Sequence, residues 1–424
     1  MPRALCSLRS VHVSETVEIT GHLIDTGILS RVLDDVREYG GDWVIDRFDV
    51  GHEAADLSSA MITISTGDDE ALQRLLMRLQ TRGVNQVDPG EAETSVCEMD
   101  GVFPDGFYST TNLETRVRWQ GRWLSVENPE MDCGLIVDDS ADPVRIYTLP
   151  MADVKAGMKV VCGASGLRVD APVLTKAEGS FGFMESDVSS EKPQAVLVRQ
   201  VADGIREAKA NGQKVLWVGG PGVVHTGAAP AMVALVRAGF VDVLFAGNAL
   251  ATHDIESALF GTSLGVDLAQ GRGVEHGHEH HIRALNTIRK AGSIRAAVEQ
   301  GVLTSGIMHA LVTGDKEYVL VGSVRDDGPL PDVYTDVIEG QRAMRGKLPG
   351  VGFCLMVATM LHSVATGNIL PASIPLVCVD INPATVTKLA DRGSSQARGI
   401  VTDVGLFLEQ LAGELVEGYT TKRS

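Results

Sequence analysis

Three glycines and a proline follow a short apolar run in KVLWVGGPGVVHTG, residues 214–227. Val215–Val218 has the composition of a buried strand, and only glycine allows the backbone that follows to bend sharply and to approach a phosphate closely. Backbone amides at such a turn, together with the positive end of the next helix, Ala228–Ala238, can hold a pyrophosphate. The pattern therefore predicts a dinucleotide site made by Gly219, Gly220, Pro221 and Gly222.

The dinucleotide fingerprint in this stretch is incomplete. Its full form is G-x-G-x-x-G, and Gly220 and Gly222 supply the first two glycines, whereas His225 occupies the third position. The acidic residue expected about 20 positions further on, at the end of the next strand, is also missing, because Val241–Ala246 does not end in one. A strand-to-helix turn that binds no ligand is therefore an open alternative.

A second strand end, in LVCVDINP at residues 376–383, supplies the acidic group that the glycine turn lacks. The apolar run ends in Asp380, and Asn382 followed by proline has the form of a helix start with Asn as the cap. A carboxylate in this position accepts hydrogen bonds from both ribose hydroxyls and repels a 2′-phosphate, which favours NAD over NADP. The alternative is that Asp380 only caps or turns the chain. Because GIVTD at residues 399–403 repeats the strand-then-Asp pattern, a further cofactor contact is predicted at Thr402 or Asp403.

Two more polar side chains follow the second strand of the same region, in FAGNALATHDIE at residues 245–256. Asn248 and Asp254 flank the expected nucleotide crevice, where they can bind ribose or orient a nicotinamide amide. A loop and helix cap is the alternative for both.

Histidines are concentrated in EHGHEHH, residues 275–281. On a helix, His276 and His280 would share a face at four-residue spacing, but no carboxylate or cysteine at a recognisable spacing completes a closed metal site. We therefore predict no bound metal, and instead a polar loop that leads into a helix with one histidine near the cofactor.

The middle of the chain offers charged groups suited to an amino acid. Glu130 and Asp132 can hold an ammonium group, and Asn112 can donate or accept at either end of the ligand. Cys133 is a candidate nucleophile, but neighbouring carboxylates disfavour its thiolate, so a structural role is favoured. The candidates for binding a carboxylate are Arg116, Arg118 and Lys155.

Composition narrows the class of protein. The chain has 424 residues, 44% of them apolar, which is enough for two or three domains. A formal net charge of -18 argues against nucleic acid or an anionic membrane as a partner and suits cationic ligands. Six cysteines without C-x-x-C pairing favour reduced thiols, and the sequence has no signal peptide and no apolar run long enough to span a membrane, so we predict a cytoplasmic protein.

Hydrophobic patterning predicts three domains. Residues 1–96 follow the order β-α-β-β-α-β of a ferredoxin-like α+β domain, and Pro89–Thr94 has the composition of a linker. Residues 97–193 consist of short β-prone runs, which predict a β-rich substrate domain. Residues 194–424 alternate apolar strands with helices, including a helix at Gly352–Ala365, and so predict a Rossmann-like NAD-binding domain with a parallel sheet covered on both faces.

These stretches resemble a known enzyme family. Residues 16–96, with VEITGHLIDTGILSRVLDDV and then EYGGDW, resemble the small conserved domain between the two enzymes of plant lysine-ketoglutarate reductase/saccharopine dehydrogenase. The motifs GFYSTTN, EMDCG, VSSEKP, VGGPGVVHTG, GNALATHDIE and VDINP, with GIVTDVGLFL near the end, resemble the archaeal-type NAD-dependent ornithine cyclodeaminases. The same family forms the carboxy-terminal part of cyanobacterial arginine dihydrolase, and its nucleotide domain is similar to deoxyhypusine synthase.

The resemblance implies a reaction. Hydride passes from Cα of ornithine to NAD, the δ-amine attacks the resulting imine and expels ammonia, and the cyclic imine recovers the hydride to give proline. This chemistry needs a pocket sealed from water, a base for the amine and acidic groups for a dicationic substrate. We therefore expect Asn112, Glu130 and Asp132 to contact substrate, with Lys155 or Lys192 as a proton-transfer group, in a homo-oligomer.

Two other functions remain open. One is an amino- or imino-acid dehydrogenase that releases NADH, and the other is a non-catalytic nucleotide sensor whose first domain reports an amino acid. Net production of NADH from ornithine would distinguish the dehydrogenase, and ligand binding without turnover would distinguish the sensor.

Overall fold

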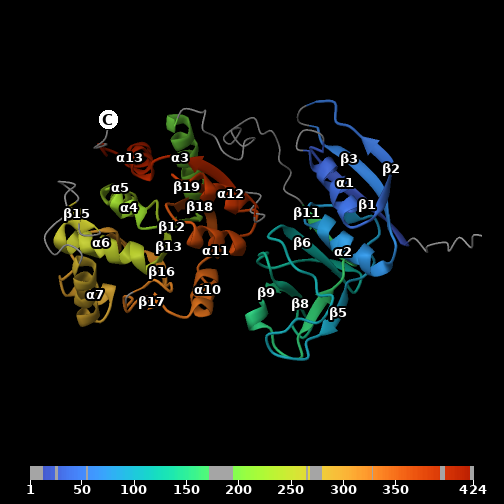
Figure 1. The fold of residues 1–424 in the computed structure, drawn as a ribbon, viewed down its shortest axis with the longest axis horizontal. Helices are drawn as coiled ribbons and strands as arrows, with labels where there is room; N and C mark the ends of the chain where they lie inside the picture. The colour runs from blue at the N-terminus through green and yellow to red at the C-terminus, as the bar shows by residue number, and fades with distance from the viewer. Residues whose placement is uncertain are drawn as a thin grey trace, which may run out of the picture. The chain divides into compact units, whose positions relative to one another are not determined.

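The computed structural model of the chain describes residues 13–23, 27–53, 56–170, 194–263, 266–267, 279–326, 328–391 and 397–420. It divides into two compact units, Met1–Ala177 with Pro371–Ser373, and Glu178–Leu370 with Ile374–Ser424 (Figure 1). The predicted domain 1–96 and most of 97–193 fall in the first unit, and all but three residues of 194–424 fall in the second. Among the described residues, no helix combines the length and apolar character that crossing a membrane requires.

The first unit begins with the predicted ferredoxin-like fold. Its antiparallel sheet has the order β2-β3-β1-β4, and two helices bury their apolar faces against it. In β3 every second residue is buried, because alternate side chains of a strand point to opposite faces. Asp68 caps the second helix by accepting a hydrogen bond from Ala71 N at 2.7 Å. The elements are β1 (Val13–Gly21), α1 (Ile28–Glu38), β2 (Asp42–Asp49), β3 (Ser58–Thr66), α2 (Asp69–Gln80) and β4 (Asn85–Gln86).

The predicted β-rich region follows within the same unit. It forms a four-stranded sheet, β5-β10-β8-β9, and a three-stranded sheet, β11-β6-β7. The linker prediction for Pro89–Thr94 is wrong at its end, because Glu93 and Thr94 belong to β5 and pair with Cys162 and Val161 of β10. The strands are β5 (Glu93–Val96), β6 (Glu114–Trp119), β7 (Arg122–Ser125), β8 (Gly134–Asp138), β9 (Arg145–Leu149), β10 (Lys159–Cys162) and β11 (Leu167–Asp170).

The second unit is built on the predicted Rossmann-like sheet. All seven strands are parallel, in the order β17-β16-β13-β12-β18-β19-β20. In β12, Val215 and Trp217 face one apolar core and Leu216 and Val218 face the other, so both faces of the sheet are covered. The strands are β12 (Lys214–Gly219), β13 (Val243–Gly247), β16 (Glu317–Val321), β17 (Val333–Tyr334), β18 (Val351–Val357), β19 (Leu376–Asp380) and β20 (Ala397–Val401).

Helices lie on both sides of this sheet (Figure 1). The larger core includes side chains of α3, α5, α6, α9 and α13, and the smaller one includes side chains of α10, α11 and α12. A short antiparallel pair, β14 (Thr262–Ser263) and β15 (Val266–Asp267), follows α6. The helices are α3 (Gln194–Ala210), α4 (Gly222–His225), α5 (Ala229–Arg237), α6 (Asn248–Phe260), α7 (His280–Ala291), α8 (Ile294–Glu299), α9 (Ile307–Thr313), α10 (Val337–Arg345), α11 (Leu361–Ile369), α12 (Pro383–Asp391) and α13 (Val404–Leu415).

The prediction of one helix over Gly352–Ala365 is wrong. The stretch is the buried strand β18 followed by α11. A short apolar run that is buried on both faces cannot be told from a buried helix by periodicity, and β18 lies between β12 and β19. The misassigned strand, β18, is therefore central in the sheet. From β12 the chain adds β13, β16 and β17 on one side and then returns to place β18 on the other, so the strand order reverses between β12 and β18.

Candidate functional site

The glycine turn lies where the strand order reverses, at the carboxyl ends of β12 and β18. Gly220 N donates to Val357 O at 2.9 Å. A Cβ on Gly220 would lie 1.8 Å from the carbonyl oxygen of Ala358, and one on Gly222 would lie 2.9 Å from the Ala358 side chain. Glycine is therefore required here for two strand ends to pack closely, at the position where open α/β sheets bind ligands.

The helix that begins at this turn is shorter than predicted. Instead of leading directly into α5, the turn leads into α4, which has four residues. Val223 N and Val224 N donate to Gly220 O and Pro221 O, at 3.2 and 2.9 Å. Gly222 N has no acceptor among the described residues, so one amide of the turn remains for a phosphate oxygen and the dipole of α4 adds little.

Asp380 lies on the same edge of the sheet, two strands away. It is 8% exposed, and its Oδ1 accepts a hydrogen bond from Asn382 N at 2.8 Å. Its Oδ2 accepts none from the described part of the chain. Asn382 Oδ1 accepts from Ala384 N at 3.0 Å, so the predicted cap with Pro383 as the first helical residue is confirmed.

Thr402 and Asp403 follow β20 on this edge. Thr402 N donates to Asp380 O at 3.1 Å, which joins the two strand ends. Asp403 caps α13 by accepting from Leu406 N at 2.7 Å. Both side chains are half-buried. The edge thus brings the predicted groups Asp380, Asn382, Thr402 and Asp403 together.

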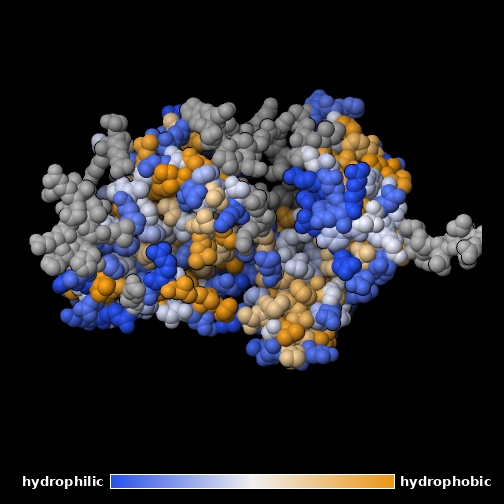
Figure 2. Space-filling view, in the orientation of Figure 1, coloured by the Kyte–Doolittle hydropathy of each residue, from blue (hydrophilic) through white to orange (hydrophobic). Residues whose placement is uncertain are grey.

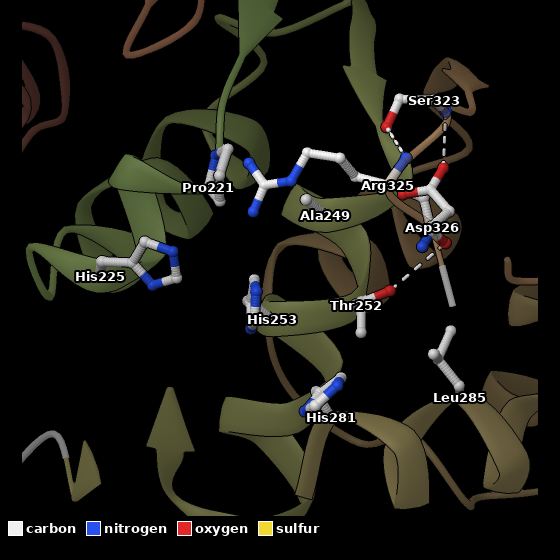
Figure 3. Close-up of a pocket in the computed structure, with 11 residues that line it drawn as sticks. Pro221, His225, Ala249, Thr252, His253, His281, Leu285, Ser323, Arg325 and Asp326 are labelled. Carbon is white, nitrogen blue, oxygen red and sulfur yellow. Dashed lines mark hydrogen bonds between the residues drawn. The ribbon is translucent and has the colours of Figure 1, made fainter. Parts of the chain in front are cut away.

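On the other side of the glycine turn is a cavity of about 420 Å³. Asn248, the first residue of α6, is buried in its wall, and its Oδ1 accepts from Leu330 N at 3.0 Å and from Thr252 Oγ1 at 3.3 Å. These two bonds fix the amide so that Nδ2 can donate to a ligand. The lining residues are Pro221, His225, Asn248, Ala249, Thr252, His253, His281, Leu285, Ser323, Arg325 and Asp326 (Figure 3).

Three histidines from three helices face this cavity: His225, His253 and His281. The sequence predicts one histidine of residues 275–281 near the cofactor, but it assigns no role to His225 or His253. His253 Nδ1 lies 2.8 Å from Oε2 of Glu256, whose side chain is fully buried. The ring of His225 meets that of His253 edge-on, with centroids 4.8 Å apart. Burial lowers the pKa of His225, and His253 lowers it further against the opposing effect of Glu256. The available signal was the spacing of positions 249, 252, 253 and 256, which share one face of a helix that begins at a strand end.

The predicted cluster around His276 lies partly outside the described residues. His280 and His281 begin α7, and His281 faces the cavity. Within the described ranges, no three His, Cys, Asp or Glu side chains are placed to hold a metal ion.

Asp254 does not line the cavity. Its Oδ1 accepts from Ile307 N at 2.7 Å and its Oδ2 from Met308 N at 2.8 Å, so both oxygens hold the first turn of α9. Burial raises the pKa of Asp254 to about 6, although these two hydrogen bonds oppose the shift. For this residue the geometry favours the helix-capping alternative.

In the first unit, Thr110 joins the two predicted substrate loops. Its Oγ1 donates to Glu130 O at 2.6 Å and accepts from Cys133 N at 3.0 Å, and its backbone oxygen accepts from Asp132 N at 3.2 Å. Asn112, two residues further on, is buried. Glu130 is buried as well, and its Oε1 accepts from Cys133 Sγ at 2.8 Å, whereas Asp132 is exposed. The structure therefore brings Asn112, Glu130 and Asp132 into one region.

Three of the predicted basic groups form ion pairs with carboxylates. Lys155 forms an exposed ion pair with Asp100 at 3.1 Å, and Lys192 is outside the described residues. Arg116 pairs with Asp170 at 2.7 Å and Arg118 with Glu91 at 3.3 Å. Both arginines are thus engaged by carboxylates of the same unit.

Three family models together match nearly the whole chain. The LOR/SDH bifunctional enzyme conserved region matches residues 14–113, and the first region of the arginine dihydrolase ArgZ-like C-terminal part matches residues 114–198. The Rossmann fold of the same ArgZ-like C-terminal part matches residues 199–411.

Whole-length relatives agree with the family models. The ornithine cyclodeaminase of Methanothermobacter thermautotrophicus is 51% identical over 94% of this chain and 97% of its own length. The one from Methanopyrus kandleri is 50% identical over 95% and 97%. The bifunctional arginine dihydrolase/ornithine cyclodeaminase AgrE of Nostoc is 40% identical over 95% of this chain and 58% of its own length.

Solved structures show the same relationship. Cyanobacterial ArgZ superimposes with a TM-score of 0.82 at 35% identity, over 95% of this chain and 58% of its own. A LOR/SDH protein from Methanococcus maripaludis gives a TM-score of 0.72 at 47% identity, over 77% and 98%. The ternary complex of AgrE with ornithine and NAD⁺ gives 0.51 at 39% identity, over 95% and 57%.

Proposed function

Because this chain belongs to the family of archaeal-type ornithine cyclodeaminases, we propose that it is a cyclising ammonia-lyase that converts L-ornithine into L-proline and ammonia with NAD as a catalytic cofactor. The match to the Methanothermobacter enzyme, which covers 97% of that enzyme at 51% identity, carries this proposal. When bound, NAD accepts a hydride from Cα of ornithine and returns it to the cyclic imine.

The carboxyl edge of the sheet in the second unit has groups that fit NAD. Asp380 Oδ2 can accept a hydrogen bond from the adenine ribose, Gly222 N can donate to the pyrophosphate, and Asn248 Nδ2 can donate to the nicotinamide amide. Asp380 and Asn248 follow strands that are three positions apart, which corresponds to roughly 14 Å at the usual strand spacing. That span suits an extended dinucleotide.

Two neighbouring groups complete this assignment. In Figure 3 the guanidinium of Arg325 is directed toward Pro221 of the glycine turn, where its positive charge can hold a pyrophosphate oxygen. Thr402 and Asp403 adjoin Asp380 and can reach the adenosine. The adenosine then occupies the β19 and β20 side of the edge, and the nicotinamide occupies the cavity of His225 and His253.

For the substrate, the buried carboxylate of Glu130 and the exposed one of Asp132 supply the negative charge that a dicationic amino acid needs. Asn112 can donate to the substrate carboxylate or accept from an ammonium group. Thr110 holds the loop of Glu130 and Asp132 in place through four hydrogen bonds, the fourth from Thr110 N to Cys133 O at 2.9 Å. We assign ornithine to these three residues.

Two broader properties belong to the same proposal. Exposed apolar side chains of β2 support a homo-oligomer (Figure 2): Val44, 62% exposed, lies on one face of the sheet, and Ile45 and Phe48, 41% and 37% exposed, lie on the other. Free thiols at the five described cysteines support a reducing, cytoplasmic location.

Incubation with ornithine deuterated at Cα and a small amount of NAD tests the reaction. Because the same hydride leaves and returns, proline should form with deuterium retained at Cα, one ammonia per proline and no net NADH. Accumulation of NADH would instead identify an amino-acid dehydrogenase. Binding of NAD and ornithine without turnover would identify a sensor, and either result would refute the proposal.

A further inference from the structure

We propose that His253, positioned by the buried Glu256, is the group that moves protons during ring closure. The inference rests on the proposed function, and it assigns a residue to the proton-transfer role that sequence reasoning gave to Lys155 or Lys192. The observation behind it is a fully buried carboxylate that orients a histidine in the wall of the cofactor cavity.

Burial of the Glu256 carboxylate is unfavourable unless hydrogen bonds replace those it would make to water. Removing a carboxylate from water costs several kcal/mol, which hydrogen bonds must offset. Its Oε2 contacts His253 Nδ1 at 2.8 Å, and its Oε1 accepts from Thr262 Oγ1 at 3.0 Å. The same Thr262 oxygen lies 2.8 Å from His280 Nδ1, so its one proton goes to Glu256 and it accepts from His280.

This network fixes the tautomer of His253. A carboxylate accepts hydrogen bonds only, so Nδ1 of His253 carries the proton that faces Glu256. The lone pair of a neutral imidazole is then on Nε2, on the opposite side of a ring that lines the cavity. The geometry therefore provides a general base, because the hydrogen bond to Glu256 holds this tautomer and this ring orientation.

The groups around the ring are compatible with proton uptake. His225 of α4 and His281 of α7 face it from two helices, and Arg325 with Asp326 faces the cavity from the segment after β16 (Figure 3). Burial and the neighbouring His253 lower the pKa of His225, so that ring stays neutral and does not repel a proton on His253 at neutral pH. Oδ2 of Asp326 accepts a hydrogen bond from Ser323 N at 2.7 Å.

The proton steps balance without another reactant. His253 Nε2 takes a proton from the δ-ammonium group, and the freed lone pair forms the bond to the imine carbon. The imidazolium gives its proton to the former α-amine, and the neutral imidazole so formed then takes a proton from the new ring nitrogen. The old C–N bond breaks with its electron pair leaving on ammonia, and the lone pair of the ring nitrogen forms the ring C=N bond. Transfer of the remaining proton to ammonia yields ammonium and restores neutral His253.

The variants H253Q and E256Q test this assignment. H253Q should bind NAD and oxidise ornithine as the wild type does, but proline formation should fall by about 100-fold or more, the usual contribution of a general acid-base group. Reduced nicotinamide absorbance should therefore accumulate on the enzyme after mixing with ornithine. H309Q is the matched control, because His309 on α9 is absent from the cavity lining, and it should behave as wild type.

E256Q gives a second readout that does not depend on H253Q folding. A neutral amide can turn either its oxygen or its NH2 group toward the ring, so the tautomer of His253 is no longer fixed and kcat should fall, while the KM for ornithine should stay within about twofold of wild type. Unchanged thermal midpoints and NAD affinities would show that the cavity is intact.

Wild-type protein that makes no proline refutes the proposed function, whatever the variants do. If the wild type makes proline, two results overturn the role of His253. One is proline formation by H253Q within threefold of wild type, and the other is loss of the hydride step together with ring closure. A kcat that is unchanged in E256Q contradicts the positioning role of Glu256.

Discussion

The two edges of the seven-stranded sheet differ in whether their polar and charged groups have partners. At the amino edge, Asp242 accepts hydrogen bonds from Lys209 Nζ at 2.8 Å, Lys316 Nζ at 3.2 Å and Val215 N at 2.9 Å. Glu317, at the start of β16, lies between Lys214 and Lys347 at 3.1 and 2.6 Å. Every one of these charges has a partner of opposite sign, so the amino edge stabilises the fold.

At the carboxyl edge, polar atoms are left for a ligand. Asp380 Oδ2, Gly222 N and Asn248 Nδ2 have no hydrogen-bond partner within the described part of the chain, and His253 and Arg325 face a cavity. Parallel strands bring all their carboxyl ends to this one edge. Charged groups are thus neutralised at the amino edge, whereas polar atoms without partners among the described residues lie at the carboxyl edge, where we propose that NAD binds.

Gly220→Ala should have the largest effect. Its Cβ would lie 1.8 Å from the Ala358 carbonyl, so the ends of β12 and β18 must separate at a cost above the about 1–3 kcal/mol of an overpacked core. We expect a large fall in the thermal midpoint and loss of NAD binding. Gly346→Ala is the control, since its nearest atoms are 3.5 and 3.6 Å away. A Gly220→Ala protein with wild-type stability would show that the close packing is not needed.

Asp380→Ala should weaken NAD binding strongly and should change the free energy of unfolding much less. Loss of a charged acceptor for the ribose hydroxyls removes about 1.5–3 kcal/mol, which raises the Kd for NAD by about 10–100-fold. Loss of the negative charge should also narrow the preference for NAD over NADP. Isothermal titration with both cofactors measures these changes, and an unaltered Kd for NAD would remove Asp380 from the site.

Asp242→Asn should show the reverse pattern, with about 1–3 kcal/mol lost from the free energy of unfolding and kcat unchanged. Burial works to raise the pKa of Asp242, but the hydrogen bonds from Lys209, Val215 N and Lys316 outweigh it and hold the pKa below its usual value. A lowered folded-state pKa gives stability that is present above the unfolded pKa of about 3.9 and is lost as the pH falls through the folded value.

Urea unfolding at several pH values measures this contribution. The gap between wild type and Asp242→Asn should be constant from about pH 7 to 5 and should shrink below about pH 4. A gap that grows on acidification would contradict the assigned pKa shift, and a loss of NAD affinity would contradict the separation of the two edges.

Asn382→Ala should have the smallest effect. Loss of the α12 cap costs about 1 kcal/mol, and because Asn382 adjoins Asp380, NAD affinity should fall a few-fold. Asp336→Ala removes the cap of α10 in the same way, since Asp336 accepts from Ile338 N at 2.8 Å. Equal losses of stability in the two variants, with reduced NAD affinity only for Asn382→Ala, would localise the effect to the Asp380 region.

The sequence allowed most of the sheet to be predicted, because apolar strands such as Val215–Val218 end in glycine or aspartate. Strand β18 was wrongly predicted as part of a helix, because its continuous apolar run has no period that separates strand from helix. Asp380 and Asn248 could be proposed as cofactor contacts from the sequence, because Asp380 ends an apolar strand and Asn248 directly follows one. His253 and Glu256 could not, since their importance comes from burial and from a cavity formed by helices and a loop distant in sequence.

In the first unit, the residue types allowed Glu130 and Asp132 to be predicted as substrate contacts. The residue that holds their loop, Thr110, was not predicted. Thr110 is an ordinary residue in a polar loop, and only the three-dimensional contacts show that its hydroxyl and backbone join the two loops. Ion pairs such as Lys155 with Asp100 likewise follow from the fold, because their partners are far apart in sequence.

A crystal structure of the protein with NAD tests most directly whether the carboxyl edge of the sheet binds the cofactor. We expect the adenine ribose within hydrogen-bond distance of the Asp380 carboxylate, the pyrophosphate against Gly220 and Gly222, and the nicotinamide in the cavity beside Asn248 and His253. NAD bound away from this edge, with Asp380 touching only solvent or protein, would contradict the assignment.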